Sequence, residues 1–260
     1  MRFLYSLIIL LIISIPSISI ADTQRRISDQ KNTVTVTLPN QKKQLYYPHP
    51  VRLEQLIKDV NKQTDFYHLG AVLSNSNQQK VMDEKYSDIM NALSSLSRQT
   101  SLFSSGNIFK QSAMHVTNQL RKHTFVDRIF TSLDVDLLRI NDKMNPLISG
   151  EYQLTLGPRP ADVSFFGAID SENSLLLPLI EHSTIDDYLE KVPLSPFADT
   201  SIIYVIQPNG EVQTTEFSIW QNKTVYLAPG ATVYVPFANL PTDFHTLNDS
   251  IVQLLRNKAF

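Results

Sequence analysis

Arg128 is the polar residue whose type and position point most clearly to a chemical role. It stands between a Ser-, Asn- and Gln-rich stretch with helical spacing and the strand pattern that follows. A guanidinium is a planar fork of donors that matches a carboxylate or phosphate, so Arg128 could hold an acidic glycan in a cleft between these parts. Arg121, Lys122 and Arg139 would add positive potential. The alternative is a salt bridge that ties the two parts of the chain together.

A second candidate is the carboxylate pair Asp134 and Asp136, two positions apart. On a strand this spacing places both side chains on one face, and two carboxylates at a suitable separation can hydrolyse a glycosidic bond. The pair lies in a stretch with the pattern of a loop, so a turn or sheet-edge role is the other interpretation. Tyr152 and Trp220 are candidates for stacking on sugar rings, with a place in the core or an interface as the alternative.

Other common chemistries lack their residue patterns. Zinc sites need convergent ligands, and the six histidines are scattered without metal-ligand spacing: His49, His68, His115, His123, His182 and His245. There is no cysteine, no Gly-rich phosphate loop and no Gly-x-Ser-x-Gly elbow. We therefore predict no catalytic residue, no metal and no cofactor. The net charge of -2 gives no electrostatic case for nucleic acid.

The first 21 residues have the features of a secretory signal peptide. Arg2 precedes an apolar run from Leu4 to Ile15, which Pro16 ends, and small residues lead to a cleavage site after Ala21. An uncleaved membrane anchor is the alternative, although the run is short for a span of about 20 residues. We expect an exported mature protein that is soluble.

The chain after the signal begins with strand patterns. Thr33–Leu38 alternates with period two, and Gln44–Tyr47 can return as its hairpin partner across Pro39–Asn40. Val51–Val60 has one apolar face and predicts a short helix. A hairpin followed by a helix is the order in which a β-grasp unit opens.

Helical spacing then interrupts the strands. Asn75–His123 predicts two amphipathic helices with a break at Ser104–Gly106, and so a helical hairpin inserted into the first β unit. Strand patterns resume at Arg128–Thr131 and at Tyr152–Leu156.

A second β unit follows the Pro158-Arg159-Pro160 turn. Its expected helix runs from Ser183 to Val192, with Thr184 or Ser183 as the cap. Its expected strands are Asp162–Ile169, Ser174–Ile180, Ser201–Gln207, Glu211–Ile219, Thr224–Leu227 and Thr232–Pro236. The order of these elements is again that of a β-grasp unit.

The chain ends in an amphipathic helix that we expect over Thr242–Lys258, with Thr242–Asp243 capping its start. Its apolar face carries Leu247, Ile251, Leu254 and Leu255. This face either packs on its own domain or docks on a partner protein or a membrane surface.

These elements predict an α+β fold. We expect two β-grasp domains, a helical hairpin inserted in the first, and a C-terminal amphipathic helix. The expected segments are a signal peptide at 1–21, a first domain at 22–157 with its insertion at about 75–123, a second domain at 158–240, and the terminal helix at 241–260.

Several stretches resemble the GfcC-like capsule-biosynthesis family of bacterial periplasmic proteins. They are Val126–Ile129, Leu133–Asp136, Asn145–Leu147, Gly150–Tyr152, Pro158–Pro160, Val163–Ala168, Tyr204–Gly210 and Ala228–Phe237. The resemblance implies β-grasp domains like the SLBB-type soluble domains of outer-membrane polysaccharide export proteins. It brings no established catalytic residues. The Gly-Arg pair of the family is Asp127–Arg128 here, which leaves the role of this arginine open.

The resemblance implies a non-enzymatic accessory protein of capsule or exopolysaccharide assembly or export, in the periplasm of a Gram-negative bacterium. Its expected partners are the surface polysaccharide, the outer-membrane polysaccharide export protein, or both. We expect a monomer, with a peripheral contact of the terminal helix as one alternative. The competing hypotheses are a periplasmic glycan-modifying enzyme and a scaffold that touches only protein.

Overall fold

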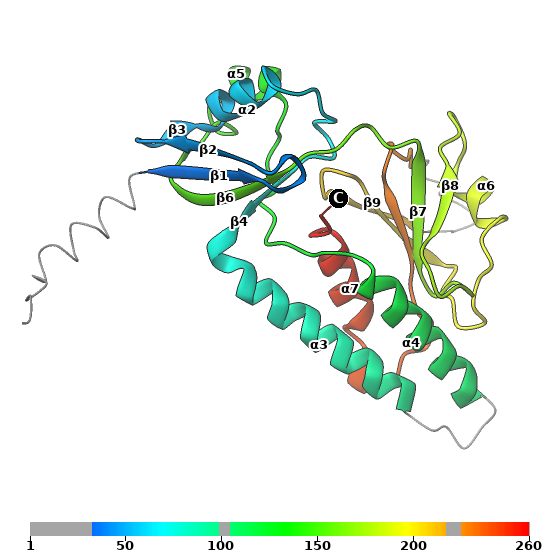
Figure 1. The fold of residues 1–260 in the computed structure, drawn as a ribbon. Coiled ribbons are helices and arrows are strands. Elements are labelled where there is room, and N and C mark those ends of the chain that lie inside the picture. The colour runs from blue at the N-terminus through cyan, green and yellow to red at the C-terminus, as the bar shows by residue number, and fades with distance from the viewer. Residues whose placement is uncertain (1–32, 99–104, 217–224, 260) are drawn as a thin grey trace, which may run out of the picture.

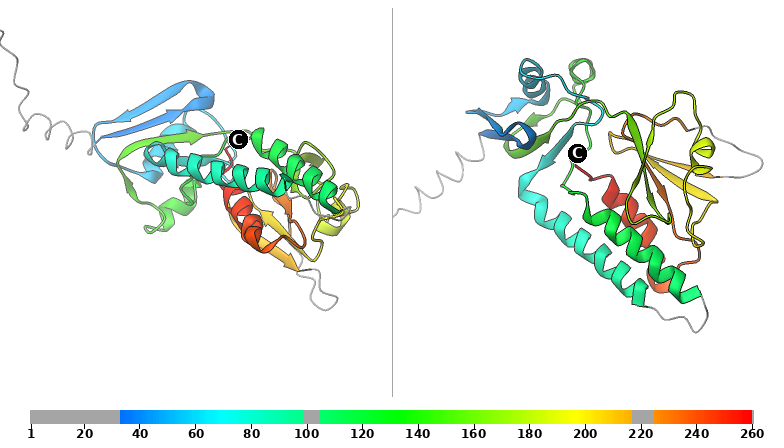
Figure 2. Two further views of the ribbon diagram at one scale, coloured as in Figure 1. Left: turned by 90° about the horizontal axis from the view of Figure 1, so that it is seen from below. Right: turned by 45° about the vertical axis from the view of Figure 1, so that its right-hand side comes forward.

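The computed structural model describes residues 33–98, 105–216 and 225–259. The predicted signal peptide and Trp220 lie outside these ranges. The described chain forms two β-sheets with helices packed on them, as Figures 1 and 2 show. The α+β class predicted from the sequence is therefore confirmed. The assignment to β-grasp domains and the predicted domain boundaries stay predictions.

The first sheet has four strands in the order β2-β1-β6-β4. These are β1 (Val34–Leu38), β2 (Lys43–Tyr47), β4 (Val72–Asn75) and β6 (Gly150–Thr155). β1 and β6 run parallel, and the other two pairs are antiparallel. The helices α2 (Leu53–Asn61) and α5 (Val135–Ile140) cover one face of this sheet, beside a short ribbon of β3 (Val51–Arg52) and β5 (Leu147–Ile148). The alternating apolar residues of β1 pack inward with α2 in a small core.

The second sheet has five strands in the order β10-β9-β11-β7-β8. They are β7 (Asp162–Gly167), β8 (Leu175–Pro178), β9 (Ile202–Ile206), β10 (Val212–Glu216) and β11 (Thr232–Val235). Here too one central pair, β7 and β11, is parallel. The short helix α6 (Ile185–Leu189) begins at Thr184 with a capping box, as its sequence predicts.

The helical hairpin follows a strand of the first sheet in the sequence, but it packs on the second sheet. α3 (Gln79–Arg98) and α4 (Ser105–Arg121) follow β4 and lie side by side below both sheets in Figure 1, next to α7 (Leu247–Leu255). Their buried apolar residues belong to one large core with those of β7, β9 and β11. The insertion therefore links the two sheets.

Several elements differ from the expectation, and β3, β4, α5 and β5 were not predicted. Arg128–Thr131 is not a strand: it makes one isolated bridge, Arg128 with Ser74, before the backbone turns. The described part of the predicted strand Thr224–Leu227 is irregular. The terminal helix starts at Leu247 rather than Thr242, because a 3-10 turn over Thr242–Phe244 comes first. In the described residues, no helix has the length and apolar character needed to cross a membrane.

Candidate ligand cleft between the two sheets

The backbone at Arg128 is held on two sides. Its backbone forms an antiparallel bridge with Ser74 of β4, the edge strand of the first sheet. Its N–H donates to the Asn257 side chain at 3.2 Å. The chain just before it forms a bridge between Phe125 and Lys258 of the C-terminal tail. Arg128 is thus placed where the helical hairpin, the first sheet and the tail meet.

The Arg128 side chain contacts both structural units, by which we mean each sheet with the helices packed on it. Its Nη2 donates to the Pro208 carbonyl oxygen at 2.7 Å and to that of Ala71 at 3.4 Å. Within the described chain no carboxylate lies within 4.0 Å of it, so the salt bridge that we considered is absent there. Burial and the nearby charge of Arg256 lower the pKa of Arg128 to about 10, which leaves it charged at neutral pH.

Phe130 brings two arginines together. Its ring centroid is 5.8 Å from Cζ of Arg128 and 4.4 Å from Cζ of Arg256. Arg256 also donates from Nε to the Gly210 carbonyl oxygen at 2.8 Å. Gly210 has φ +83°, and a Cβ there would lie 2.5 Å from the Phe130 ring. The turn between β9 and β10 therefore needs glycine to admit this ring.

These residues line a cleft of about 590 Å³ between the two units, a size in the range of ligand pockets. Its walls are the loop before β4, the start of α5, the β9–β10 turn and the end of α7. The charged lining residues are the cations Arg128, Lys143 and Arg256 and the carboxylates Asp134 and Glu211. Leu69, Phe130, Leu137 and Met144 add exposed apolar surface. The cleft therefore holds three cations against two carboxylates, beside apolar side chains, so an anionic group would fit only near the arginines or Lys143.

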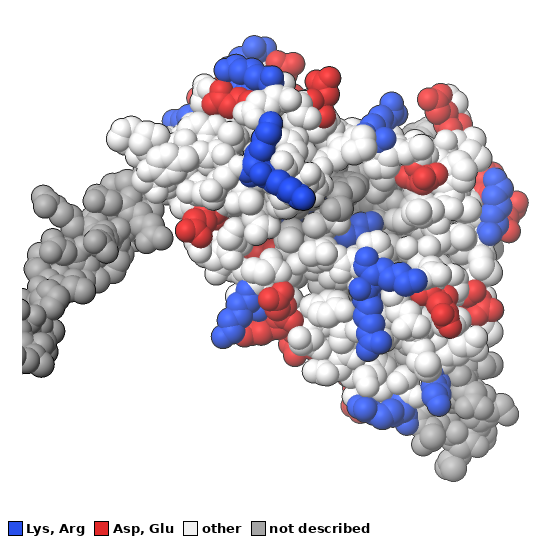
Figure 3. Space-filling view, viewed as in Figure 1, with Lys and Arg blue, Asp and Glu red and all other residues white. Residues whose placement is uncertain are grey.

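On the face that Figure 3 shows, charge is not gathered in one broad patch. On the face in Figure 3, Lys and Arg side chains are interspersed with Asp and Glu. An anion would therefore be held by the local arrangement in the cleft rather than by a wide basic patch.

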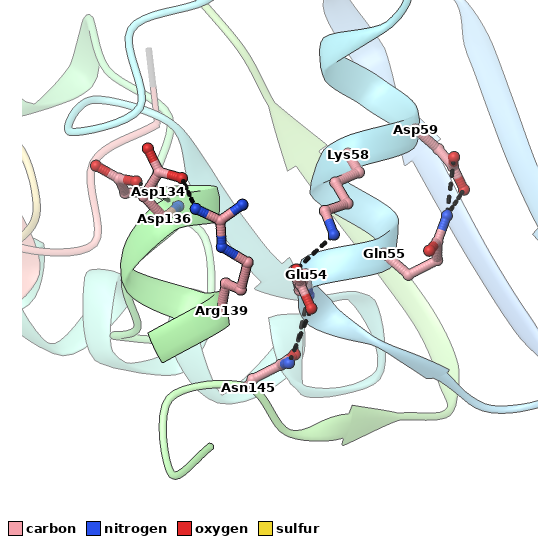
Figure 4. Close-up of polar contacts among 8 residues, drawn as sticks. All are labelled: Glu54, Gln55, Lys58, Asp59, Asp134, Asp136, Arg139 and Asn145. Atoms are coloured by element: carbon pink, nitrogen blue, oxygen red, sulfur yellow. Dashed lines mark hydrogen bonds and ion pairs between the residues drawn. The ribbon is translucent and has the colours of Figure 1, made fainter. Parts of the chain in front are cut away.

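Asp134 and Asp136 do not both face the cleft. Figure 4 shows both at the start of α5, where we expected a loop. The Oδ1 of Asp134 accepts from the N–H of Asp136 at 2.8 Å and of Leu137 at 3.4 Å, which makes it the N-cap. Asp136 pairs instead with Arg139 on the same helix at 2.9 Å. Only Asp134 of the two lines the cleft.

A second network in Figure 4 anchors one wall of the cleft. Asn145 follows Lys143 and Met144, and its Oδ1 accepts from the N–H of Glu54 at 3.0 Å. The carboxylate of Glu54 pairs with Lys58 at 2.6 Å. This contact fastens the loop that carries Lys143 to α2.

The other candidates lie elsewhere. Arg139 is exposed and does not line the cleft, and neither do Arg121 and Lys122 at the end of α4. Tyr152 packs partly into the first core and donates from its hydroxyl to the Ser149 carbonyl at 3.1 Å. Trp220 is not described.

The apolar face of the terminal helix is buried in its own chain. Leu247, Ile251, Leu254 and Leu255 are at most 4% exposed and belong to the large core. Of the two alternatives for this face, the structure shows packing within its own chain, so these four side chains are not free to dock on a partner or a membrane. What α7 offers to the cleft is Arg256, at its C-terminal end.

Phe130, Lys143 and Arg256 were missed by the sequence reasoning. The only local signal was that Arg256 lies on the polar side of an amphipathic helix. In the described chain, no group of three His, Asp or Glu side chains could hold a metal ion.

Two family profiles match most of the chain. One, described as capsule biosynthesis GfcC, N-terminal, matches residues 30–159, and the other, capsule biosynthesis GfcC C-terminal, matches residues 173–259. The uncharacterized protein YjbG of Escherichia coli K12 is 32% identical over 108 residues. That match spans 42% of this chain and 43% of the length of YjbG. The name of this relative carries no activity to transfer.

Proposed function

The chain belongs to the GfcC capsule biosynthesis family, and on that premise we propose a non-enzymatic accessory protein of capsule or exopolysaccharide assembly or export. We place its work in the periplasm, in line with the signal peptide expected at residues 1–21. The polymer binds in the cleft between the two sheets, and the outer-membrane polysaccharide export protein is a further partner.

The observation that carries this proposal is the arrangement of Arg128 and Arg256 around Phe130. Neither guanidinium has a carboxylate partner within 4.0 Å among the described residues, and both are held by backbone carbonyl oxygens. An acidic sugar could place its apolar ring face on Phe130 and its carboxylate or phosphate near the arginines. Partial burial strengthens such charge interactions relative to those in open water.

The arginines are poor first targets for mutation, because both make structural contacts. Arg128 donates to carbonyl oxygens of Ala71 and Pro208, and Arg256 ties the end of α7 to the β9–β10 turn. Lys143 is a cleaner probe, since it is exposed, lines the cleft and has no side-chain partner in the described chain. A contact to a charged group contributes about 1.5–3 kcal/mol, so Lys143→Gln should weaken polymer binding about tenfold. The matched control is Lys43→Gln on the outer strand β2.

The test is calorimetric titration of the mature protein with fragments of the surface polysaccharide of the encoding strain. Binding that Lys143→Gln weakens and Lys43→Gln does not would support the cleft. If the two variants bind alike, the cleft is not the site. If the wild-type protein binds no fragment, glycan binding fails, and a scaffold that contacts only the export protein takes its place.

One observation favours the competing hypothesis of a glycan-modifying enzyme: the carboxylates of Asp134 and Glu211 line the same cleft. Glycosidases use two carboxylates, one as acid and one as base or nucleophile. Against this, Asp134 is engaged as the cap of α5. New reducing ends on incubation with the polymer, lost in Glu211→Gln, would establish this activity and end the non-enzymatic proposal.

A further inference from the structure

A second hollow of about 250 Å³ lies beside the linker between the two sheets. Arg159 of the linker, Ile180 and His182 after β8, and Tyr226 before β11 line it. It is separate from the cleft at Arg128 and shares no lining residue with it.

The aromatic wall of this hollow is exposed yet held in place. Tyr226 is 67% exposed, the highest value among the aromatic residues with large exposed surface in the described chain. The Gln207 side chain holds the backbone of this segment with two hydrogen bonds. Its Nε2 donates to the Tyr226 carbonyl at 2.8 Å, and its Oε1 accepts from the Ala228 N–H at 3.1 Å. The backbone at this position is thus held, and its solvent-facing ring is a surface on which the apolar face of a sugar can rest.

The charged wall is equally constrained. Arg159 sits between two prolines, and Pro160 packs on Gly230, where a Cβ would lie 2.8 Å from the proline ring. The linker is bonded to the turn after β8 through Leu179 N–H and the Ala161 carbonyl, 2.8 Å apart. No carboxylate of the described residues lies within 4.0 Å of Arg159, although Glu181 lines the same hollow. The guanidinium is therefore available to an anionic ligand.

The two hollows flank one turn. Gln207, which holds Tyr226, accepts a hydrogen bond from the Gly210 N–H at 2.8 Å, and Gly210 lines the first cleft. On the other side, the Tyr67 N–H donates to the Gly157 carbonyl at 2.9 Å, which joins the linker to the loop before β4. The next residue of that loop, His68, lines the first cleft. The β9–β10 turn and the linker therefore connect residues of the two hollows through a few bonded neighbours, and a polymer long enough to pass this turn could contact both.

From this geometry we propose that the hollow at Arg159 and Tyr226 is a second subsite for an acidic polysaccharide, which one polymer chain occupies together with the cleft at Arg128. The inference rests on the proposed function, because it assumes that a glycan binds the cleft. Two linked contacts raise the affinity for a ligand long enough to reach both. Affinity should therefore rise with fragment length and then level off.

The test uses size-fractionated fragments of the surface polysaccharide of the encoding strain, titrated into the full mature chain. Tyr226→Ala should weaken binding of long fragments about fivefold, from the lost ring contact. Arg159→Gln should weaken it about tenfold, from the lost charged contact. Both should bind short fragments as the wild type does. Lys143→Gln, in the first cleft, should weaken short and long fragments alike.

The matched controls are Tyr46→Ala and Arg121→Gln, an exposed tyrosine on β2 and an exposed arginine at the end of α4. Both should bind as the wild type does, and circular dichroism should show every variant folded. If Tyr226→Ala and Arg159→Gln bind long fragments at wild-type affinity, the second subsite is refuted while the first stands. If the wild type binds no fragment of any length, both proposals are refuted.

Discussion

Replacing Lys258 by methionine should stabilise the protein, because the fold buries an ammonium group that has no carboxylate partner. Lys258 lies in the tail after α7. The residue as a whole is partly exposed, but its ammonium group is buried, with Nζ 5.5 Å from the Phe166 ring centroid. Its one hydrogen bond among the described residues runs to Thr232 Oγ1 at 3.1 Å. Desolvation lowers the pKa of Lys258 from 10.5 to about 8.

The size of the effect follows from this pKa. At about 1.4 kcal/mol per pKa unit, the fold disfavours the charged amine by roughly 3 kcal/mol relative to the unfolded chain. Methionine has a similar shape and no charge, but it leaves the Thr232 hydroxyl without its partner, at a cost of about 1 kcal/mol. We therefore expect the free energy of unfolding at pH 7 to rise by about 1–2 kcal/mol, and the melting temperature by about 2–8 °C.

The assay is urea unfolding of wild type and Lys258→Met at several pH values. Between pH 8 and 10.5 the unfolded chain keeps a proton on Lys258 that the folded chain has released, so wild-type stability rises with pH. The variant lacks this rise, so its advantage of about 1–2 kcal/mol should vanish between about pH 8.5 and 9.5, and above that range the wild type should be the more stable protein. The raised pKa of Tyr204, which lowers stability at high pH, is common to both proteins and cancels in their difference.

Two outcomes would refute this reasoning. One is a loss of stability in Lys258→Met at pH 7, and the other is a difference between the two proteins that does not change between pH 8 and 10. Lys43→Met, on the exposed strand β2, is the matched control and should leave the pH profile unchanged.

Three further predictions concern stability. Gly167→Ala should destabilise the protein by about 3 kcal/mol or more in urea unfolding, since φ is +102° and the new Cβ would lie 2.0 Å from a carbonyl oxygen on β11; a loss below 1 kcal/mol would contradict the geometry. Thr184→Ala removes the capping box of α6 and should cost about 1 kcal/mol, whereas Thr184→Ser should cost little. Burial and the nearby ammonium of Lys258 lower the pKa of His123 to about 4. Stability should therefore fall as the pH drops from 6.5 to 4, because the unfolded chain takes up a proton that the folded chain does not. The fall should be smaller in His123→Gln, and an equal fall would exclude this histidine as the cause.

Local sequence rules predicted the elements that depend on neighbouring residues. The alternation of Val34, Val36 and Leu38 places these side chains on the buried face of β1, as period two requires. Thr184 caps α6, and the helical spacing of 79–121 predicted both helices of the hairpin. Each of these features is set within a few residues, which is why pattern alone was sufficient.

The same kind of rule was available for Asp134 and was applied wrongly. An aspartate just before apolar residues at helical spacing is a helix N-cap signal, and the structure places α5 there. The strand expected at Arg128–Thr131 failed for another reason. Its apolar residues suit a strand, but after one bridge to Ser74 the backbone turns and Phe130 lines the cleft instead of the sheet.

The sequence by itself determined the α+β class, the family resemblance and the approximate place of most elements, but not β4, α5 or the short β3–β5 ribbon. It singled out Arg128 as a candidate but could not show what surrounds it. The cleft joins Arg128 to Lys143, Gly210 and Arg256, which are far apart in the chain. The periodicity of a helix shows which face is apolar but not which sheet that face will cover, so the packing of α3, α4 and α7 on the second sheet had to come from the tertiary structure. That packing brings the C-terminal end of α7, with Arg256, to the first sheet and so creates the cleft.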